Sequence, residues 1–265
     1  MKNIFIFFLF FSFSVQVFGQ TNTIYAEDGT FQSTGKNVAV TVNSMGGVTQ
    51  TGSIAITSAL QTNNPRTRTF SFRLPNANPD CNRPLLIALH GDGGTGAGMM
   101  SSTGFNTVAD AENFIAVYPN SLTVNGGIQW NKFADGVAGS GDNGNDANAA
   151  DDEKFIADLI DYFYLNYGID RSKVYVTGYS GGGFMTYFLA LSNQTKNKIA
   201  AIAPVAASLW GNNTYLEAQT ASGTFVPTPL LHIHSTTDGT VPFPTLGGWT
   251  WPLASFSDFV RSLRQ

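Results

Sequence analysis

The sequence has a single cysteine, Cys81, among its 265 residues. One thiol cannot form an intramolecular disulfide, so the folded state must depend on a buried core. The chain can build such a core, because 43% of its residues are hydrophobic and its length suits one or two domains. Cys81 lies in a polar turn without a basic, helix-borne neighbour, and we expect its thiol to be inert.

Charged residues are also scarce, at 12% of the chain, and the formal net charge is −4. This balance provides neither a basic stripe for nucleic acid nor a polybasic patch for a membrane surface. We therefore expect no nucleic-acid partner, and a neutral or apolar ligand that is held by a specific pocket.

No apolar run is long enough to cross a membrane. The longest, residues 4–13, follows Lys2 and leads through small or polar residues to Gly19. It falls short of the ~20 residues that span a bilayer, and the order of features is that of a secretory signal peptide. The sequence predicts a signal peptide over residues 1–19 and a secreted protein, extracellular or periplasmic, without membrane contact after cleavage.

The sequence pattern changes near residue 65. Residues 20–65 are rich in Thr, Ser, Asn and Gly with short alternating runs, which predicts a β-rich N-terminal extension or linker. Residues 66–265 are expected to form one α/β catalytic domain, because short apolar runs alternate there with helical patterns. The expected strands are residues 84–90, 114–118, 173–177, 199–205 and 229–234, and the clearest helix is 152–167.

The strand at 173–177 leads into residues 178–182, which read Gly-Tyr-Ser-Gly-Gly and precede a helical pattern. A GxSxG motif between a strand and a helix presents its serine on a sharp turn, beside amides that can stabilise an oxyanion. We therefore predict that Ser180 is a nucleophile for a carbonyl carbon, with the Gly181 N–H as an oxyanion donor.

The loop after the strand at 84–90 is the second expected part of this site. It reads His-Gly-Asp-Gly-Gly over residues 90–94, and the N–H of Asp92 is the second predicted oxyanion donor, with the N–H of Gly93 as the less favoured alternative. His90 is expected to stiffen the loop by hydrogen bonding. The loop also matches GxGxxG, but the next strand lacks the acidic residue that would hold a ribose, so we expect no cofactor.

A carboxylate after a late strand would orient a catalytic histidine, and Asp238 follows the strand at 229–234. The His-x-His pair at 232–234 could join Asp238 in a metal site, but the spacing supplies no good third ligand. The acidic loop at 142–153 resembles a calcium loop, yet it lacks the glycine that such a loop requires. We expect no metal.

The general base is the missing part of this site. Serine is a weak nucleophile until a base removes its proton, and the three histidines, His90, His232 and His234, all precede Asp238. The expected chain order places the base after the acid. We therefore expect the chain to be incomplete at its C-terminus, without the last strand and the histidine loop.

From about residue 69 onward, the chain resembles the secreted polyhydroxybutyrate depolymerases and feruloyl and acetylxylan esterases, carbohydrate esterase family 1 of the α/β-hydrolase superfamily. The matching segments are residues 85–94, 118–120, 130–131, 151–178, Ser180 and 234–242. The resemblance implies an α/β-hydrolase fold, in which helices flank a mostly parallel sheet. Members carry the base in a Gly-Gly-His-x-Trp-Pro segment well beyond the acid, whereas residues 247–252 here have Trp249 at the histidine position.

The resemblance also implies roles for individual residues. Ser180 would be the nucleophile and Asp238 the triad acid, with the Asp92 and Gly181 amides as oxyanion donors. Trp130 would lie near the substrate cleft, although a packed loop aromatic is an equal alternative. Tyr179, which precedes the nucleophile, is the second candidate substrate-binding residue.

Two functions are compatible with these residues. The first is a secreted, monomeric serine esterase that hydrolyses a polymeric or small ester through an acyl-enzyme on Ser180. The substrate would be a polyhydroxyalkanoate or a feruloylated or acetylated polysaccharide. The alternative is a non-catalytic polymer-binding pseudoenzyme that lacks the triad histidine.

Overall fold

The computed structural model describes residues 24–25, 31–32, 47–59, 64–75, 82–124, 127–132, 150–209 and 213–243. The chain divides into two compact units, Met1–Val42 and Asn43–Gln265. In the first unit, strand β1 (Ile24–Tyr25) pairs antiparallel with β2 (Phe31–Gln32). The expected signal peptide, Cys81, the acidic residues at 142–149 and residues 247–252 lie outside the described residues.

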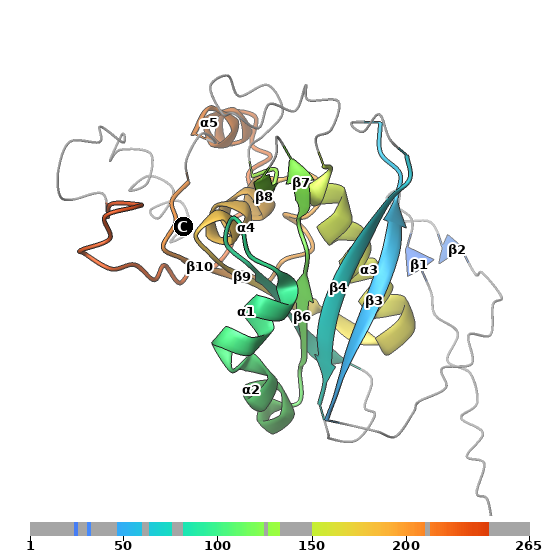
Figure 1. Ribbon diagram of the computed structural model, residues 1–265. Coiled ribbons are helices and arrows are strands. Elements are labelled where there is room, and N and C mark those ends of the chain that lie inside the picture. The colour runs from blue at the N-terminus through green and yellow to red at the C-terminus, as the bar shows by residue number, and fades with distance from the viewer. Residues whose placement is uncertain are drawn as a thin grey trace, which may run out of the picture. The chain divides into compact units, whose positions relative to one another are not determined.

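The second unit contains a six-stranded sheet with the order β10-β9-β5-β6-β4-β3 (Figure 1). Strands β5, β6, β9 and β10 are parallel, and β4 runs antiparallel to both of its neighbours. The mostly parallel sheet that the sequence predicts is therefore confirmed. The strands are β3 (Val48–Ile56), β4 (Arg66–Leu74), β5 (Arg83–Leu89), β6 (Ile115–Pro119), β9 (Ile169–Tyr179) and β10 (Ala201–Val205).

Strand β3 differs from the expectation for residues 20–65. It pairs with β4 from Val48 to Ile56 without a break, so this segment belongs to the main sheet and not to an extension. The physical reason is its alternation: every second side chain of β3 turns toward the domain, as in a strand that covers one face of a core. The α/β unit accordingly begins at Asn43.

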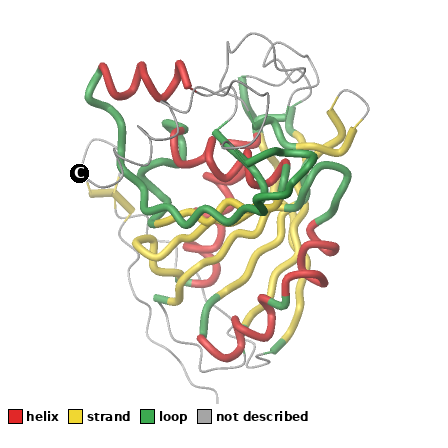
Figure 2. Tube along the Cα trace, turned by 90° about the vertical axis from the view of Figure 1, so that its left-hand side faces the viewer, coloured by secondary structure: helices red, strands yellow, loops and turns green. Residues whose placement is uncertain are grey.

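Helices cover both faces of the sheet (Figure 2). The helices are α1 (Gly96–Thr103), α2 (Phe105–Glu112), α3 (Asp152–Tyr167), α4 (Gly181–Leu191) and α5 (Asn213–Ala221). The bounds of α3 match the predicted helix. The Asp151 side chain caps it by accepting a hydrogen bond of 2.9 Å from Lys154 N–H, and Gly168 ends it at a φ of 61°, which glycine adopts readily.

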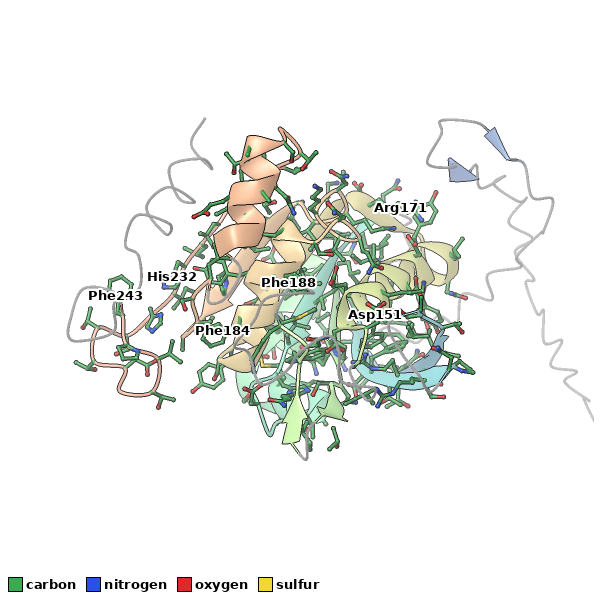
Figure 3. All side chains as sticks on the ribbon, turned by 90° about the horizontal axis from the view of Figure 1, so that it is seen from above. Asp151, Arg171, Phe184, Phe188, His232 and Phe243 are labelled. Carbon is green, nitrogen blue, oxygen red and sulfur yellow. The ribbon has the colours of Figure 1, made fainter. Side chains whose placement is uncertain are left out.

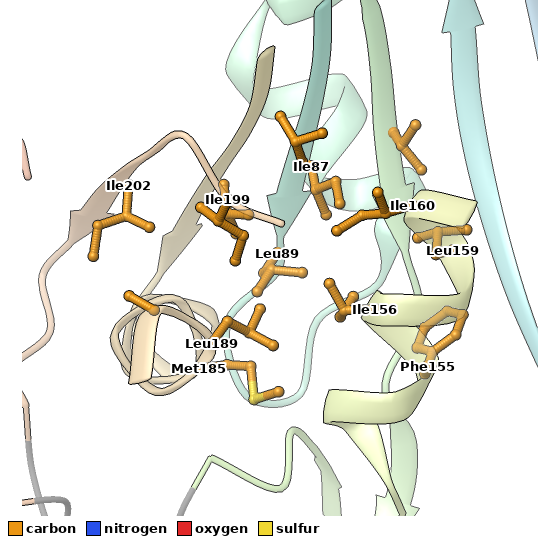
Figure 4. Close-up of a cluster of buried hydrophobic side chains, with 14 of the residues drawn as sticks. Ile87, Leu89, Phe155, Ile156, Leu159, Ile160, Met185, Leu189, Ile199 and Ile202 are labelled. Carbon is orange, nitrogen blue, oxygen red and sulfur yellow. The ribbon is translucent and has the colours of Figure 1, made fainter. Parts of the chain in front are cut away.

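Successive side chains of β5 and β6 supply two separate layers of the core. Ile87 and Leu89 of β5 pack with α3 and α4 in the larger layer (Figure 4). Ala88 of β5 points the other way and packs with Ala109 of α2 in the smaller layer. Because side chains alternate along a strand, apolar runs without polar interruption can serve both layers, which is why these strands read as continuous apolar segments.

The predicted strand at 229–234 forms only two isolated bridges, Ile202↔Leu230 and Val205↔Ile233, both parallel to β10. Pro204 of β10 lies between these bridges and has no N–H to donate, so a regular ladder is interrupted there. A short hairpin of β7 (Leu122–Val124) and β8 (Gly127–Gln129) completes the strands. Among the described helices, none is both long and apolar enough to cross a membrane.

Candidate active site

Ser180 lies on a sharp turn between β9 and α4. Its φ of 51° and ψ of −119° place it in a region that residues other than glycine rarely adopt, and such strain is typical of functional sites. Its backbone N–H donates to the carbonyl of Val205 over 3.0 Å, which ties the turn to the end of β10. The structure thus presents Ser180 at the carboxyl end of the parallel strands, as a nucleophile would require.

Two glycines make this turn possible because the backbone segments approach closely. A Cβ atom on Gly178 would lie 2.2 Å from the carbonyl oxygen of Gly182, and one on Gly182 would lie 2.4 Å from the carbonyl oxygen of Leu89. Neither distance is compatible with a side chain. The GxSxG pattern therefore has a steric cause at both glycines, as the motif predicts.

The loop of residues 90–94 lies against the Ser180 turn. A Cβ atom on Gly91 would be 3.4 Å from the Cβ of Ser180. The N–H of Gly93 is already bonded to the carbonyl of Ile128 over 2.7 Å, which leaves the Asp92 N–H as the candidate donor from this loop. Gly181 is the first residue of α4, so its N–H has no acceptor within the helix. These two amides are the candidate oxyanion hole.

His90 holds the loop in place, as the sequence predicts. Its Nδ1 lies 2.7 Å from the carbonyl oxygen of Gly91, and its Nε2 accepts a hydrogen bond of 3.0 Å from the Ser121 N–H. The carbonyl cannot donate, so the proton resides on Nδ1. Burial lowers the pKa of His90, and the ring is neutral at pH 7. Both nitrogens are therefore committed to the loop.

Trp130 is fully buried beside His90. Its ring lies 5.0 Å from the His90 ring, and its Nε1–H donates to the His90 carbonyl over 2.8 Å. This burial favours the packing alternative over direct contact with a substrate. Tyr179, in contrast, is 54% exposed next to Ser180, where an aromatic face is available to a ligand.

A buried ion pair between Arg68 and Asp152 contacts the segments that hold His90 in place. Arg68 Nη2 lies 2.5 Å from Asp152 Oδ1, and the two side chains are 1% and 0% exposed. Arg68 also donates to the Asn120 carbonyl over 3.1 Å, and Asp152 Oδ2 accepts from the Asn131 N–H over 2.7 Å. Asn120 and Asn131 adjoin Ser121 and Trp130, the residues that hold His90, so the ion pair connects the core to the loop of residues 90–94.

Asp238 lies in the turn after the bridge at Ile233. Its Oδ1 accepts hydrogen bonds of 2.9 Å from the N–H groups of Thr240 and Val241. These two bonds lower the pKa of Asp238, so the carboxylate is ionised at neutral pH. Its Oδ2 is 3.5 Å from His234 Nε2, longer than an ordinary hydrogen bond, and within the described part of the chain it accepts no hydrogen bond.

His232 and His234 form a chain of hydrogen bonds behind this turn. His234 Nε2–H donates to the Val241 carbonyl over 2.6 Å, and His234 Nδ1 lies 3.1 Å from His232 Nε2. His232 Nδ1 in turn lies 2.6 Å from the hydroxyl of Tyr187 on α4. Burial and the neighbouring His234 lower the pKa of His232 to about 4. Figure 3 shows His232 beside Phe243, whose ring lies 6.0 Å away.

The described residues contain no group of three or more His, Cys, Asp or Glu side chains that could hold a metal ion. Glu153, one of the calcium ligands considered above, instead accepts a hydrogen bond from Ser192 Oγ. A hollow of about 310 Å³ on β5, β9 and β10 is lined by residues that do not include Ser180. It is therefore not part of the candidate active site.

Three comparisons with known proteins bear on this geometry. A sequence profile of the phospholipase/carboxylesterase family matches residues 76–247, which is more than half of the chain. The chain belongs to this family of α/β-hydrolases. The matched range includes the Ser180 turn, the loop of residues 90–94 and Asp238.

Two curated relatives of this chain are hydrolases whose names give a polymer as the substrate. The chain is 33% identical over 168 residues to the bifunctional acetylxylan esterase/xylanase of Neocallimastix patriciarum, covering 63% of this chain and 21% of that protein. It is 31% identical over 146 residues to poly(3-hydroxyalkanoate) depolymerase C of Paucimonas lemoignei, covering 54% and 32%. The chain thus spans a fifth to a third of these relatives.

The fold of this carboxylesterase-family chain is similar to that of solved hydrolases. An S-formylglutathione hydrolase from Staphylococcus aureus superposes with a TM-score of 0.55 at 16% identity, over 82% of this chain and 87% of that one. At this identity the similarity supports the fold alone. It agrees with the α/β-hydrolase fold that the sequence predicts.

Sequence patterns did not reveal the residues that hold the site together. Lys132, Arg68 and Asp152 lie far from the Ser180 motif in chain position, and Arg68 and Asp152 have other charged residues close by in the sequence, at 66 and at 151–154. No local pattern in the sequence sets these three residues apart.

Proposed function

We propose that this chain is a secreted serine esterase that hydrolyses carboxylic ester bonds of a polymer through an acyl-enzyme on Ser180. The substrate class is a polyhydroxyalkanoate or a feruloylated or acetylated polysaccharide. The observation that carries the proposal is the strained backbone of Ser180 beside the Gly181 and Asp92 amides. Family membership supports ester hydrolysis, the two curated relatives support a polymeric substrate, and residues 1–19 support export.

The proposed reaction has two steps. The Ser180 Oγ attacks the ester carbonyl carbon, and the carbonyl oxygen becomes an oxyanion that the Asp92 and Gly181 N–H groups stabilise. The alcohol leaves with a proton that the base has taken from Ser180, and an acyl-enzyme remains. Water then attacks the acyl-enzyme, which releases the acid and restores the serine hydroxyl. Asp238 is the proposed acid that orients the base.

The base must be an imidazole other than His90, His232 and His234. Each of their six ring nitrogens lies within 3.1 Å of a hydrogen-bond partner, and none of those partners is Ser180. A histidine whose two nitrogens are both bonded to groups other than Ser180 is not placed to take the proton of that serine. Asp238 Oδ2 is the acceptor against which an additional imidazole would be oriented.

Rescue by free imidazole tests this proposal on the chain as it exists. Hydrolysis of p-nitrophenyl acetate would be measured with rising imidazole concentration, for the chain and for Ser180→Ala. Imidazole alone also cleaves this ester, so the difference between the two proteins is the relevant rate. We expect a saturable imidazole-dependent difference of at least about tenfold, because free imidazole should restore part of the about 10²–10⁴-fold that general-base catalysis contributes. Identical rates for the two proteins would refute the proposal.

The second candidate is a polymer-binding protein without turnover. The observation that favours it is that all three histidines are hydrogen-bonded to other groups. Without a general base, the reaction would lose the about 10²–10⁴-fold acceleration that such a base contributes. Pull-down on insoluble polyhydroxybutyrate and xylan separates the two functions. Polymer binding that Ser180→Ala leaves unchanged, together with no imidazole-dependent rate, would favour this candidate.

A further inference from the structure

The Asp92 carboxylate creates an electrostatic problem for the proposed oxyanion hole. The amide of Asp92 is one of the two proposed donors, and its side chain extends toward the other. A Cβ atom on Gly181 would lie 2.0 Å from Asp92 Oδ1, so the carboxylate rests against the Gly181 α-carbon. A negative charge in this position opposes the formation of a second one on the substrate oxygen.

Lys132 forms an ion pair with this carboxylate. Its Nζ lies 2.7 Å from Asp92 Oδ2, and its side chain is only 7% exposed, whereas that of Asp92 is 45% exposed. Water and salt screen a buried ammonium less than a surface one. The ion pair is therefore buried at Lys132 and open to solvent at Asp92, so the lysine contacts the carboxylate from the protein interior.

The geometry points to Lys132 as a positioning residue for the ester hydrolysis proposed above. It cancels the charge of Asp92 and holds that carboxylate to one side, so that the Asp92 and Gly181 amides present a net positive field to the developing oxyanion. This inference rests on the proposed function, because it assigns Lys132 a role at the same oxyanion hole.

The loop has other supports that a change at Lys132 leaves in place. Gly93 N–H still donates to the Ile128 carbonyl, and Trp130 Nε1–H still donates to the His90 carbonyl. Removal of the ammonium is therefore expected to change the field at the two amides more than the path of the backbone. This difference separates an electrostatic role from a merely structural one.

Affinity for phenylboronic acid measures the field without turnover. The Ser180 Oγ forms a bond to boron, the serine proton passes to solvent, and the boron becomes tetrahedral and negatively charged beside the oxyanion donors. The dissociation constant would be measured by boron NMR for wild type, Lys132→Met, Lys132→Arg and the double variant Lys132→Met/Asp92→Asn. Lys154→Met, which breaks a partly exposed ion pair with Asp158, is the matched control, and thermal unfolding checks the fold of each variant.

We expect Lys132→Met to weaken boronate binding by about tenfold or more, because oxyanion stabilisation is sensitive to single groups. Lys132→Arg and Lys154→Met should stay within about threefold of wild type. The double variant should regain most of the affinity, because Asp92→Asn removes the charge that Lys132 cancels.

Two results would overturn the inference and leave the proposed function standing. They are unchanged binding in Lys132→Met, or a double variant as weak as Lys132→Met alone. A different result would overturn the proposed function itself: no boronate adduct in wild type, or an equal adduct in Ser180→Ala.

Discussion

Breaking the ion pair between Arg68 and Asp152 should lower the free energy of unfolding by about 3 kcal/mol. Both side chains are almost fully buried, and the loss of one partner of such a pair costs about 3–5 kcal/mol. In Arg68→Met, the Asp152 carboxylate keeps its bond from Asn131 N–H and its place in the first turn of α3. Both still stabilise a negative charge, which puts the expectation at the lower end of that range.

The same strand offers a matched control. Arg73 of β4 pairs with Asp110 at 2.5 Å, but these side chains are 19% and 28% exposed, and pairs near the surface contribute about 1 kcal/mol or less. Guanidinium unfolding followed by circular dichroism would compare Arg68→Met with Arg73→Met at an unchanged m-value. The double variant Arg68→Met/Asp152→Asn should recover part of the loss. If Arg68→Met costs no more than Arg73→Met, the argument from burial is wrong.

Three further changes test other parts of the structure. Gly182→Ala places a Cβ 2.4 Å from the Leu89 carbonyl oxygen, and the resulting strain should cost about 3 kcal/mol of unfolding free energy in urea; a loss below about 1 kcal/mol would contradict the steric argument. Because burial and His234 lower the pKa of His232 to about 4, below its unfolded value near 6.5, the unfolded state binds the proton more readily. The contribution of neutral His232 to the free energy of unfolding is thus fully present above pH 6.5. The free energy of unfolding should fall by up to about 2 kcal/mol between pH 6.5 and 4; a His232→Gln variant with the same pH profile would refute this. Trp130→Phe removes the donor to the His90 carbonyl and should cost about 1 kcal/mol, measured as a lower Tm by calorimetry; an unchanged Tm would count against its role in holding the loop.

Local signals made the helix α3 and the Ser180 turn predictable. The helix has apolar residues at helical spacing, a capping Asp151 and a terminal Gly168, and each acts within a few residues of its own position. The turn is encoded in five consecutive residues, where glycine is required by close backbone contacts. Such features depend on short-range geometry, and a single sequence records them.

The supports of the site depend on contacts between distant segments. Lys132 meets Asp92 across 40 positions and Arg68 meets Asp152 across a longer separation, and no local pattern indicates either pairing. The place of β3 in the main sheet was missed for a different reason: β3 and β4 are consecutive strands, but the composition of residues 20–65, rich in Thr, Ser, Asn and Gly, indicated an extension. Trp130 was recognisable as a residue of the site, but only burial distinguishes packing from ligand contact.

Mass spectrometry of an acyl-enzyme tests the central claim most directly. The chain would be mixed with p-nitrophenyl acetate in imidazole buffer, quenched in acid, digested, and compared with Ser180→Ala. The proposed mechanism predicts one acetyl group on the peptide that contains Ser180, and none on that peptide in the variant. Acetylation elsewhere with an unmodified Ser180, or the same labelling in both proteins, would contradict it.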